Sequence, residues 1–429
     1  MPVPRLWNEL VAASGCFEVM TKEKLINSTS AMMGLDRFEL RLLHYFDKFC
    51  VPAFSYGVNK EAERFWQTLV PKVFFRSRLV RNAVFLFASI CMWPLFDMET
   101  LFLADVQEMR TLYHINNLFE VEEINSKSLT FFDLSQDHAT TNNLYAKTLE
   151  YFSDLLLESQ RRIEGSEMAL SPLRAIELSI SGTLIFLFLG LHPHNLVPIL
   201  AFQLEENTDE DSAGTSVQVP DHHIHETTDF VSICRGIQVI KEHCCLKNSK
   251  TSPYKAPKKF SSFPKESKFA LISRLNRDLI EYYSNYEGGV QQSGAIDVLK
   301  EAIELLESAF HYSTKLNYPL PLYKWPIGIP ENFGALLRQR HFFALRIYYL
   351  FSCISLMAKF CLYHERNMWR DFIEWFRKYN YKGYGGWVYR YDQSFYDLVI
   401  KKKYTILLTD FRSLYDFDAK IMMSRCEEN

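Results

Sequence analysis

Residues 323–346 read Y-K-W-P-I-G-I-P-E-N-F-G-A-L-L-R-Q-R-H-F-F-A-L-R, and this stretch, which continues to Trp375, decides the fold class. Pro326 and Pro330 end one structural element, because proline lacks a donor N–H and restricts the residue before it. The periodic apolar residues that follow predict an amphipathic helix of about 30 residues that ends near Leu362. The stretch carries no nucleophile motif, phosphate-binding glycine loop or metal-ligand spacing. It favours a helical scaffold that senses or binds, and it disfavours an enzyme.

The rest of the chain repeats this helical periodicity. From Leu35 to Cys50 apolar side chains recur at helical spacing, and Val51-Pro52 ends the pattern. Comparable patterns predict helices at residues 61–75, 77–93, 98–118, 137–164, 171–191, 269–286, 295–314, 369–379 and 392–416. Strand-like alternation is rare. The sequence therefore predicts an all-α protein.

Changes in composition predict one large helical domain with two inserts. Residues 205–226 are acidic and rich in small side chains, and residues 247–268 are locally basic and contain proline, so both are expected to be flexible loops. Residues 1–34 are mixed in composition and are expected to form a lead or linker. The helical domain is then predicted to cover residues 35–416, with a tail at 417–429.

Charge and aromatic content limit the function classes. The chain has 48 basic and 51 acidic residues, a formal net charge of -3, so the global electrostatic footprint of a nucleic-acid-binding protein is absent. Aromatic residues make up 15% of the chain, including 34 Phe and 23 Tyr. Many of them sit at helical spacing beside Leu and Ile. This surplus is expected to pack helices together or to line a cavity.

The nine cysteines form neither a paired disulfide framework nor a C-x-x-C ligand pair. Several lie in apolar runs, as Cys91 does, where a free thiol behaves as a small core side chain. A reducing intracellular compartment is expected. The first residues lack the pattern of a signal peptide, so secretion is not expected.

Two apolar stretches resemble membrane spans. Residues 176–202 are interrupted by charged, glycine, histidine and proline residues, and residues 342–363 contain Arg346 and Lys359. A span needs about 20 uninterrupted apolar residues. Both stretches are predicted to be buried core helices, and no membrane span is predicted.

Candidate chemistry in the sequence is sparse. The segment Asp221-His222-His223-Ile224-His225-Glu226, with His192 and His194, offers ligands suited to zinc, but it lies in a predicted loop and is interpreted as solvated. No G-x-S-x-G motif occurs. Gly385-Gly386 is interpreted as a turn, with a loop that lines a pocket as the alternative. No catalytic residue, metal or cofactor is predicted, and an enzyme that uses the histidines ranks last.

Several segments, taken in chain order, resemble one known family. The residues that carry the resemblance are Leu42 to Phe46, Phe65-Trp66, Val70-Pro71, Ser77 to Ser89, Tyr145 to Leu156, Phe230 to Gly236 and, most strongly, Trp325-Pro326, Ile329 to Phe333, Leu336 to Arg338, Ala344-Leu345 and Trp369. Together they resemble the regulatory domain of the fungal zinc-cluster transcription factors, in the branch that includes the sterol-uptake regulators. The resemblance covers residues from about 38 to 378.

The resemblance implies a large α-helical domain whose apolar interior accommodates a lipid such as a sterol. It also implies control of transcription in the nucleus, other transcription regulators as partners, and a homodimer. The sequence departs from the family in one respect, since no cysteine arrangement for a zinc cluster is present. Direct DNA binding by this chain is therefore not expected.

The first functional hypothesis is a transcriptional regulator that senses a hydrophobic ligand, with a pocket between the apolar helices at 176–191 and 342–362 and the turn at 384–387. The residues predicted to bind the ligand are Phe186, Phe342, Phe343, Tyr349, Tyr384 and Trp387. The alternative is a helical protein-interaction scaffold that binds no ligand.

Overall fold

The fold is all-α, as predicted. In the computed structural model 83% of the described residues are helical, and those residues contain no strand. The structure describes residues 34–52, 60, 64–92, 144–164, 172–192, 197–203, 229–243, 267–284, 293–317, 319–358, 367–406 and 411–428. The predicted helix at 98–118, the whole predicted loop at 205–226 and all but the last two residues of the predicted loop at 247–268 lie outside them.

The N-terminal helices pack around α7 (Arg78–Met92), whose side chains from Ala83 to Met92 are all buried. The other elements of this part are α3 (Arg37–Tyr45), the π-helical turns η1 (Phe46–Cys50) and η2 (Phe65–Leu69), and α6 (Val70–Phe74). A capping box starts α3, because Asp36 accepts a hydrogen bond from the Glu39 amide and Glu39 accepts one from the Asp36 amide.

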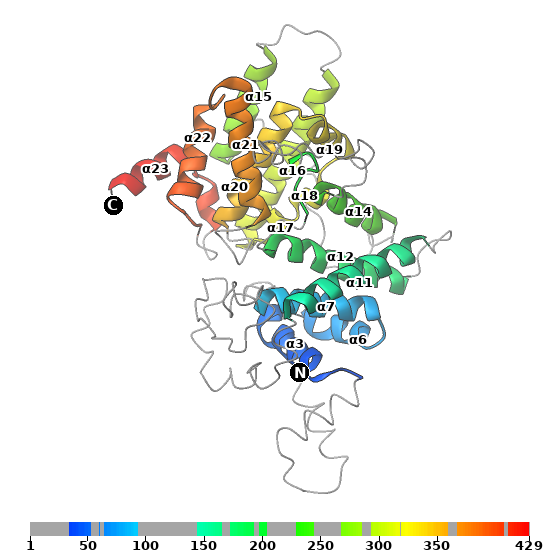
Figure 1. Cartoon of the computed structure of the whole chain (residues 1–429). Helices are drawn as coiled ribbons and strands as arrows, with labels where there is room; N and C mark the ends of the chain where they lie inside the picture. The colour runs from blue at the N-terminus through cyan, green and yellow to red at the C-terminus, as the bar shows by residue number, and fades with distance from the viewer. Residues whose placement is uncertain are drawn as a thin grey trace, which may run out of the picture.

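Three helices connect the N-terminal part with the C-terminal part. They are α11 (Leu144–Glu164), α12 (Pro172–Leu191) and α14 (Phe230–His243). Helix α12 contacts α7 on one side and α14 and α21 on the other, and it lies between the two parts in Figure 1. The sequence patterns predict no helix for the segment that contains α14.

The C-terminal part consists of helices packed around α20. In chain order these elements are α15 (Ala270–Ser284), α16 (Ser293–Leu316), α17 (Leu320–Tyr323), α18 (Trp325–Gly328), α19 (Glu331–Arg338), α20 (Phe342–Met357), α21 (Met368–Tyr384), α22 (Arg390–Tyr396), η7 (Asp397–Lys401), η8 (Phe411–Leu414) and α23 (Ala419–Glu428). In place of the single helix predicted at 392–416, the described residues form three short elements, α22, η7 and η8. Helix α23 extends away from the rest (Figure 1).

The predicted helix of about 30 residues after the Trp325 elbow is interrupted. Helix α19 ends at Arg338, and α20 begins at Phe342. Between them Arg340 adopts a φ of 57°, a left-handed conformation that no helix accommodates. The Nδ1 atom of His341 then accepts a hydrogen bond from the Ala344 amide at 3.4 Å and caps the new helix. Apolar periodicity continues across this break, which is why the pattern alone predicted a single helix.

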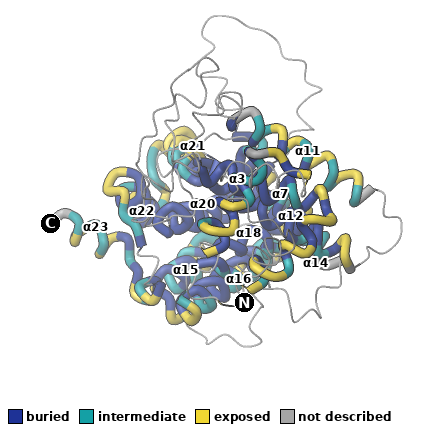
Figure 2. The backbone as a smooth tube through the Cα atoms, turned by 90° about the horizontal axis from the view of Figure 1, so that it is seen from below, coloured by how far each residue is buried: buried dark blue, intermediate teal, exposed yellow. Residues whose placement is uncertain are grey.

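Helix α20 is the centre of the C-terminal core. Every residue from Phe342 to Met357 is buried, and the helix appears dark blue in the middle of Figure 2. A helix that is apolar all round has no solvent-facing side, so it is stable only when other helices surround it. Buried hydrophobic side chains form one continuous cluster from Leu35 to Ala419.

The apolar helix α12 is also a core helix. Among the described residues, the segment Leu173–Leu191 is long and apolar enough to cross a membrane by length and composition alone, and 78% of its apolar window is buried in the protein. The helix Phe342–Met357 is shorter than a span requires. Burial against neighbouring helices agrees with the prediction that both stretches belong to the core.

Candidate functional site

The first half of α20, the end of α21 and the following turn bring together a cluster of aromatic side chains. The ring centroids of Phe342 and Tyr384 are 5.3 Å apart, and those of Tyr349 and Trp387 are 5.7 Å apart. Phe376 of α21 stacks on Tyr349 at 4.6 Å. Four of the residues predicted to bind a ligand, Phe342, Tyr349, Tyr384 and Trp387, therefore lie close together. We call Phe342, Tyr349, Phe376, Tyr384 and Trp387 the aromatic cluster.

A glycine turn places Trp387 in this cluster. Gly385 ends α21 with a φ of 71°, the left-handed conformation that glycine adopts without strain, and its amide donates to the Tyr381 carbonyl. Asn380 stabilises the end of the turn, because its Oδ1 accepts a hydrogen bond from the Val388 amide at 3.4 Å. The glycine pair predicted to form a turn thus directs the chain back across α20.

A buried ionic network borders the aromatic cluster. The guanidinium of Arg346 on α20 donates to Asp392 from Nε at 2.8 Å and from Nη2 at 3.0 Å, and it donates to Asp278 at 2.6 Å. Arg346 is fully buried and Asp392 is 1% exposed. The Tyr349 hydroxyl joins the network by donating to the main-chain oxygen of Asp392 at 2.7 Å. The network therefore ties α20 to both α15 and α22.

Burial and charge act in opposite directions on these groups. Burial raises the pKa of Asp392, and the nearby Arg346 guanidinium offsets part of that increase. Burial alone would lower the pKa of Arg346, but Asp392 and Asp278 together raise it above its ordinary value. Arg346 therefore remains a cation inside the core, held by two carboxylates.

Arg346 has one donor atom that the network does not use. Its Nη1 atom is buried and has no hydrogen-bond partner among the described residues. The ring of Tyr389 lies over the guanidinium at 3.6 Å, and Phe343 lies 5.4 Å from it. A buried donor without an acceptor is costly and uncommon in folded proteins. It marks a place where an additional oxygen atom would be stabilised.

Two of the predicted ligand-binding residues lie apart from the cluster or at its edge. Phe343 contacts Tyr282 of α15 at 5.5 Å, on the side of α20 that carries the ionic network. Phe186 of α12 stacks on Phe230 at 5.3 Å, and Phe230 meets Trp369 edge-on at 5.4 Å. Phe186 thus belongs to the contact between α12 and α14.

Arg346, Asp278 and Asp392 are not among the functional residues predicted from the sequence. In the sequence, Arg346 stands out only as a charge that interrupts an apolar stretch. A charge within an apolar helix is itself the signal that could have identified this group, because such a charge must find a counter-ion in the core. The identity of that counter-ion depends on tertiary contacts, since Asp278 and Asp392 come from helices far away in the sequence.

Metal-binding residues do not gather in the described part of the chain, where no group of three or more His, Cys, Asp or Glu could hold a metal ion. His192, one of the residues considered, is buried next to Phe188. The segment 221–226 and His194 lie outside the described residues. The free cysteines Cys50, Cys91, Cys234 and Cys353 are buried, and burial raises the pKa of Cys50 and Cys353.

Comparisons with known proteins found no match: no family model, no curated protein and no solved structure is similar to this chain. The candidate site therefore rests on its own geometry.

Proposed function

We propose that this chain is the regulatory domain of a transcriptional regulator, and that it senses a sterol or another hydrophobic molecule bound at the aromatic cluster. The observation that carries the proposal is the meeting of Phe342, Tyr349, Tyr384 and Trp387 beside the unused donor of Arg346. Ligand sites of this kind combine apolar walls with a few polar groups that fix orientation. A sterol has that composition, with a fused apolar ring system and one hydroxyl oxygen.

In this proposal the ligand oxygen accepts a hydrogen bond from Arg346 Nη1, and the apolar body of the ligand packs against the aromatic cluster. The cluster joins α20, α21 and the Gly385 turn, while Arg346 joins α20 to α15 and α22. A ligand that favours one arrangement of these helices shifts the domain toward that arrangement by its differential affinity. In the nucleus this shift would be transmitted to other transcription regulators or to a second copy of the chain, without direct DNA binding by this chain.

The test is ligand-dependent stability. Purified protein is extracted for lipid analysis by mass spectrometry, and its thermal unfolding is followed with and without ergosterol or cholesterol. A ligand at about 100 times its Kd stabilises the folded state by about 2.7 kcal/mol and raises the Tm. Tyr384→Ala is expected to abolish the increase. Phe75→Ala, a change at a comparably exposed ring near α6, is expected to leave it intact.

A ligand-free interaction scaffold is the second candidate, and the close packing of the aromatic cluster favours it. Phe376 contacts Tyr349 at 4.6 Å and also lies 6.1 Å from Phe342, so the rings already occupy much of the space between α20 and α21. If extraction yields no lipid and no sterol changes the Tm, the sensing function is rejected and the scaffold is retained.

A further inference from the structure

The end of α21 and the turn after it form a surface that is both basic and aromatic. From Arg377 to Tyr391 the sequence contains four basic residues, six aromatic residues and no acidic residue. The residues of this stretch that carry exposed charged or large apolar side chains are Lys378, Tyr381, Lys382, Tyr384, Val388 and Arg390. We call these six residues the basic aromatic surface. It lies on the outer side of the cluster described above.

The apolar side chains of this surface are unusually open to solvent. Tyr381 is 52% exposed, Tyr384 is 55% exposed and Val388 is 43% exposed. The backbone between them is also uncovered, since a Cβ added at Gly383, Gly385 or Gly386 would meet no atom within 4 Å. Interfaces between proteins are enriched in tyrosine, tryptophan and arginine relative to the rest of the surface. Tyr381, Tyr384 and Arg390 are therefore residue types that protein interfaces favour.

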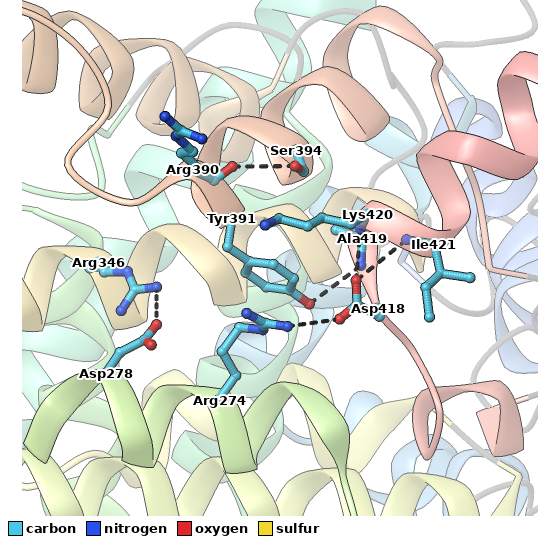
Figure 3. Close-up of polar contacts among 10 residues, drawn as sticks. All are labelled: Arg274, Asp278, Arg346, Arg390, Tyr391, Ser394, Asp418, Ala419, Lys420 and Ile421. Atoms are coloured by element: carbon cyan, nitrogen blue, oxygen red, sulfur yellow. Dashed lines mark hydrogen bonds and ion pairs between the residues drawn. The ribbon is translucent and has the colours of Figure 1, made fainter. Parts of the chain in front are cut away.

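Two of the charges of this surface are not neutralised by the described part of the protein. Lys382 and Arg390 form no ion pair with a described residue, and Figure 3 shows the Arg390 side chain directed away from Asp278 and Asp418. The nearby acid Glu374 is already engaged, because its carboxylate accepts from the Tyr396 hydroxyl at 2.9 Å and lies 3.8 Å from Arg377. Carboxylates from a partner would supply the missing negative charge.

We propose that the basic aromatic surface binds an acidic segment of a partner protein, one that combines Asp or Glu with large apolar side chains. Its carboxylates meet Lys382 and Arg390, and its apolar side chains lie on Tyr381, Tyr384 and Val388. This surface shares Tyr384 with the ligand site proposed above, but its charged residues Lys382 and Arg390 take no part in that site.

The geometry favours a protein partner over single-stranded nucleic acid. Nucleic acid binding of this kind requires open ring faces on which successive bases stack. Trp387 contacts Tyr349, Phe376 and Tyr396 with centroid distances from 5.7 to 6.3 Å, so its ring is engaged inside the protein. Tyr384 contacts Phe342 edge-on at 5.3 Å. The engaged Trp387 ring is not available for base stacking, which favours a protein partner.

The experiment measures the binding of a short fluorescein-labelled peptide of alternating Asp-Leu and Glu-Phe pairs to the full chain, by fluorescence anisotropy. The double charge reversal Lys382→Glu/Arg390→Glu is expected to weaken binding by about tenfold or more, and higher salt is expected to weaken binding to the wild type. The matched control Lys72→Glu/Lys300→Glu changes two exposed lysines on α6 and α16, and it is expected to leave the Kd within about twofold.

Three results would overturn the proposal. They are equal binding of a peptide in which Asn and Gln replace Asp and Glu, an equal loss in the control double variant, and tighter binding of oligothymidylate that depends on Lys382 and Arg390. Circular dichroism and thermal unfolding confirm that each variant is folded. If the charge reversal prevents folding, Lys382→Gln/Arg390→Gln takes its place, with an expected weakening of about threefold. Sterol is omitted throughout, so failure here is distinct from failure of ligand sensing.

Discussion

The guanidinium of Arg346 donates two hydrogen bonds to the carboxylate of Asp392, at 2.8 and 3.0 Å, although both side chains lie inside the core. This pair links α20, the most buried helix, to α22. Two charges removed from water cost several kcal/mol each, and their attraction with additional hydrogen bonds offsets that cost. The pair therefore fixes the position of α22 against α20, and it need not add net stability.

Removal of one member of this ion pair is expected to destabilise the folded protein strongly. Arg346→Met leaves the Asp392 carboxylate buried without a counter-ion, and we expect it to lower the free energy of unfolding by about 3–5 kcal/mol. The double variant Arg346→Met/Asp392→Leu removes both charges and is expected to be more stable than Arg346→Met alone. Urea denaturation of the three proteins measures the difference. A double variant less stable than Arg346→Met would contradict this account.

The glycines at the end of α21 allow a matched comparison. Gly385→Ala places a Cβ on a residue with a φ of 71° and is expected to cost about 1 kcal/mol, although space around it is open. Gly383→Ala lies within the helix, also in open space, and is expected to stabilise by about 0.5–1 kcal/mol because alanine favours the helix. Chemical denaturation distinguishes them, and the same sign for both would refute the backbone argument.

The helix cap at His341 is expected to make stability depend on pH. Burial lowers the pKa of His341 below its ordinary value of 6.5, and the neutral Nδ1 accepts from the Ala344 amide. As the pH falls below about 6.5 the unfolded chain binds a proton first, so this contribution is complete above that pH and declines toward the lower folded pKa.

The measurement for His341 is the free energy of unfolding at a series of pH values between about 7.5 and 5.5. His341→Asn is the control, because asparagine can cap a helix and does not titrate in this range. We expect the wild type to lose stability relative to His341→Asn as the pH falls. Identical pH profiles for the two proteins would show that this histidine plays no such role.

A few polar contacts of Asp418 and Tyr391 hold the start of the C-terminal helix α23 in place. Asp418 caps it by accepting from the Lys420 amide at 2.9 Å, and the same carboxylate binds Arg274 at 3.1 Å (Figure 3). The Tyr391 hydroxyl accepts from the Ala419 amide at 3.3 Å. These contacts join α23 to α15 and α22.

Loss of the Asp418 contacts is expected to loosen α23 and to leave the rest of the protein unchanged. Asp418→Ala should cost about 1 kcal/mol through loss of the cap and should accelerate hydrogen exchange at residues 420–426, with little change elsewhere. Asp416→Ala, a nearby exposed acid, is the matched control and should change neither quantity. Unchanged exchange in Asp418→Ala would mean that apolar contacts alone hold α23.

Part of the candidate site could be predicted from the sequence. The sequence predicts that the apolar stretch around Tyr349 and the glycine turn before Trp387 line a pocket, and in the structure the ring centroids of Tyr349 and Trp387 are 5.7 Å apart. Phe186 was selected for the same compositional reason, yet it packs against Phe230 in another part of the core. Composition identifies side chains that will be buried, but it does not identify their neighbours.

The sequence by itself determined that this protein is helical, because helix periodicity, proline positions and caps act over a few residues. It also determined that α12 and α20 would be core helices, since neither has a polar side. Only the tertiary structure decided where the long helix breaks at Arg340 and which acids pair with Arg346. The same holds for the rings that meet at Trp387. These features depend on contacts between segments far apart in the chain, for which local periodicity carries no information.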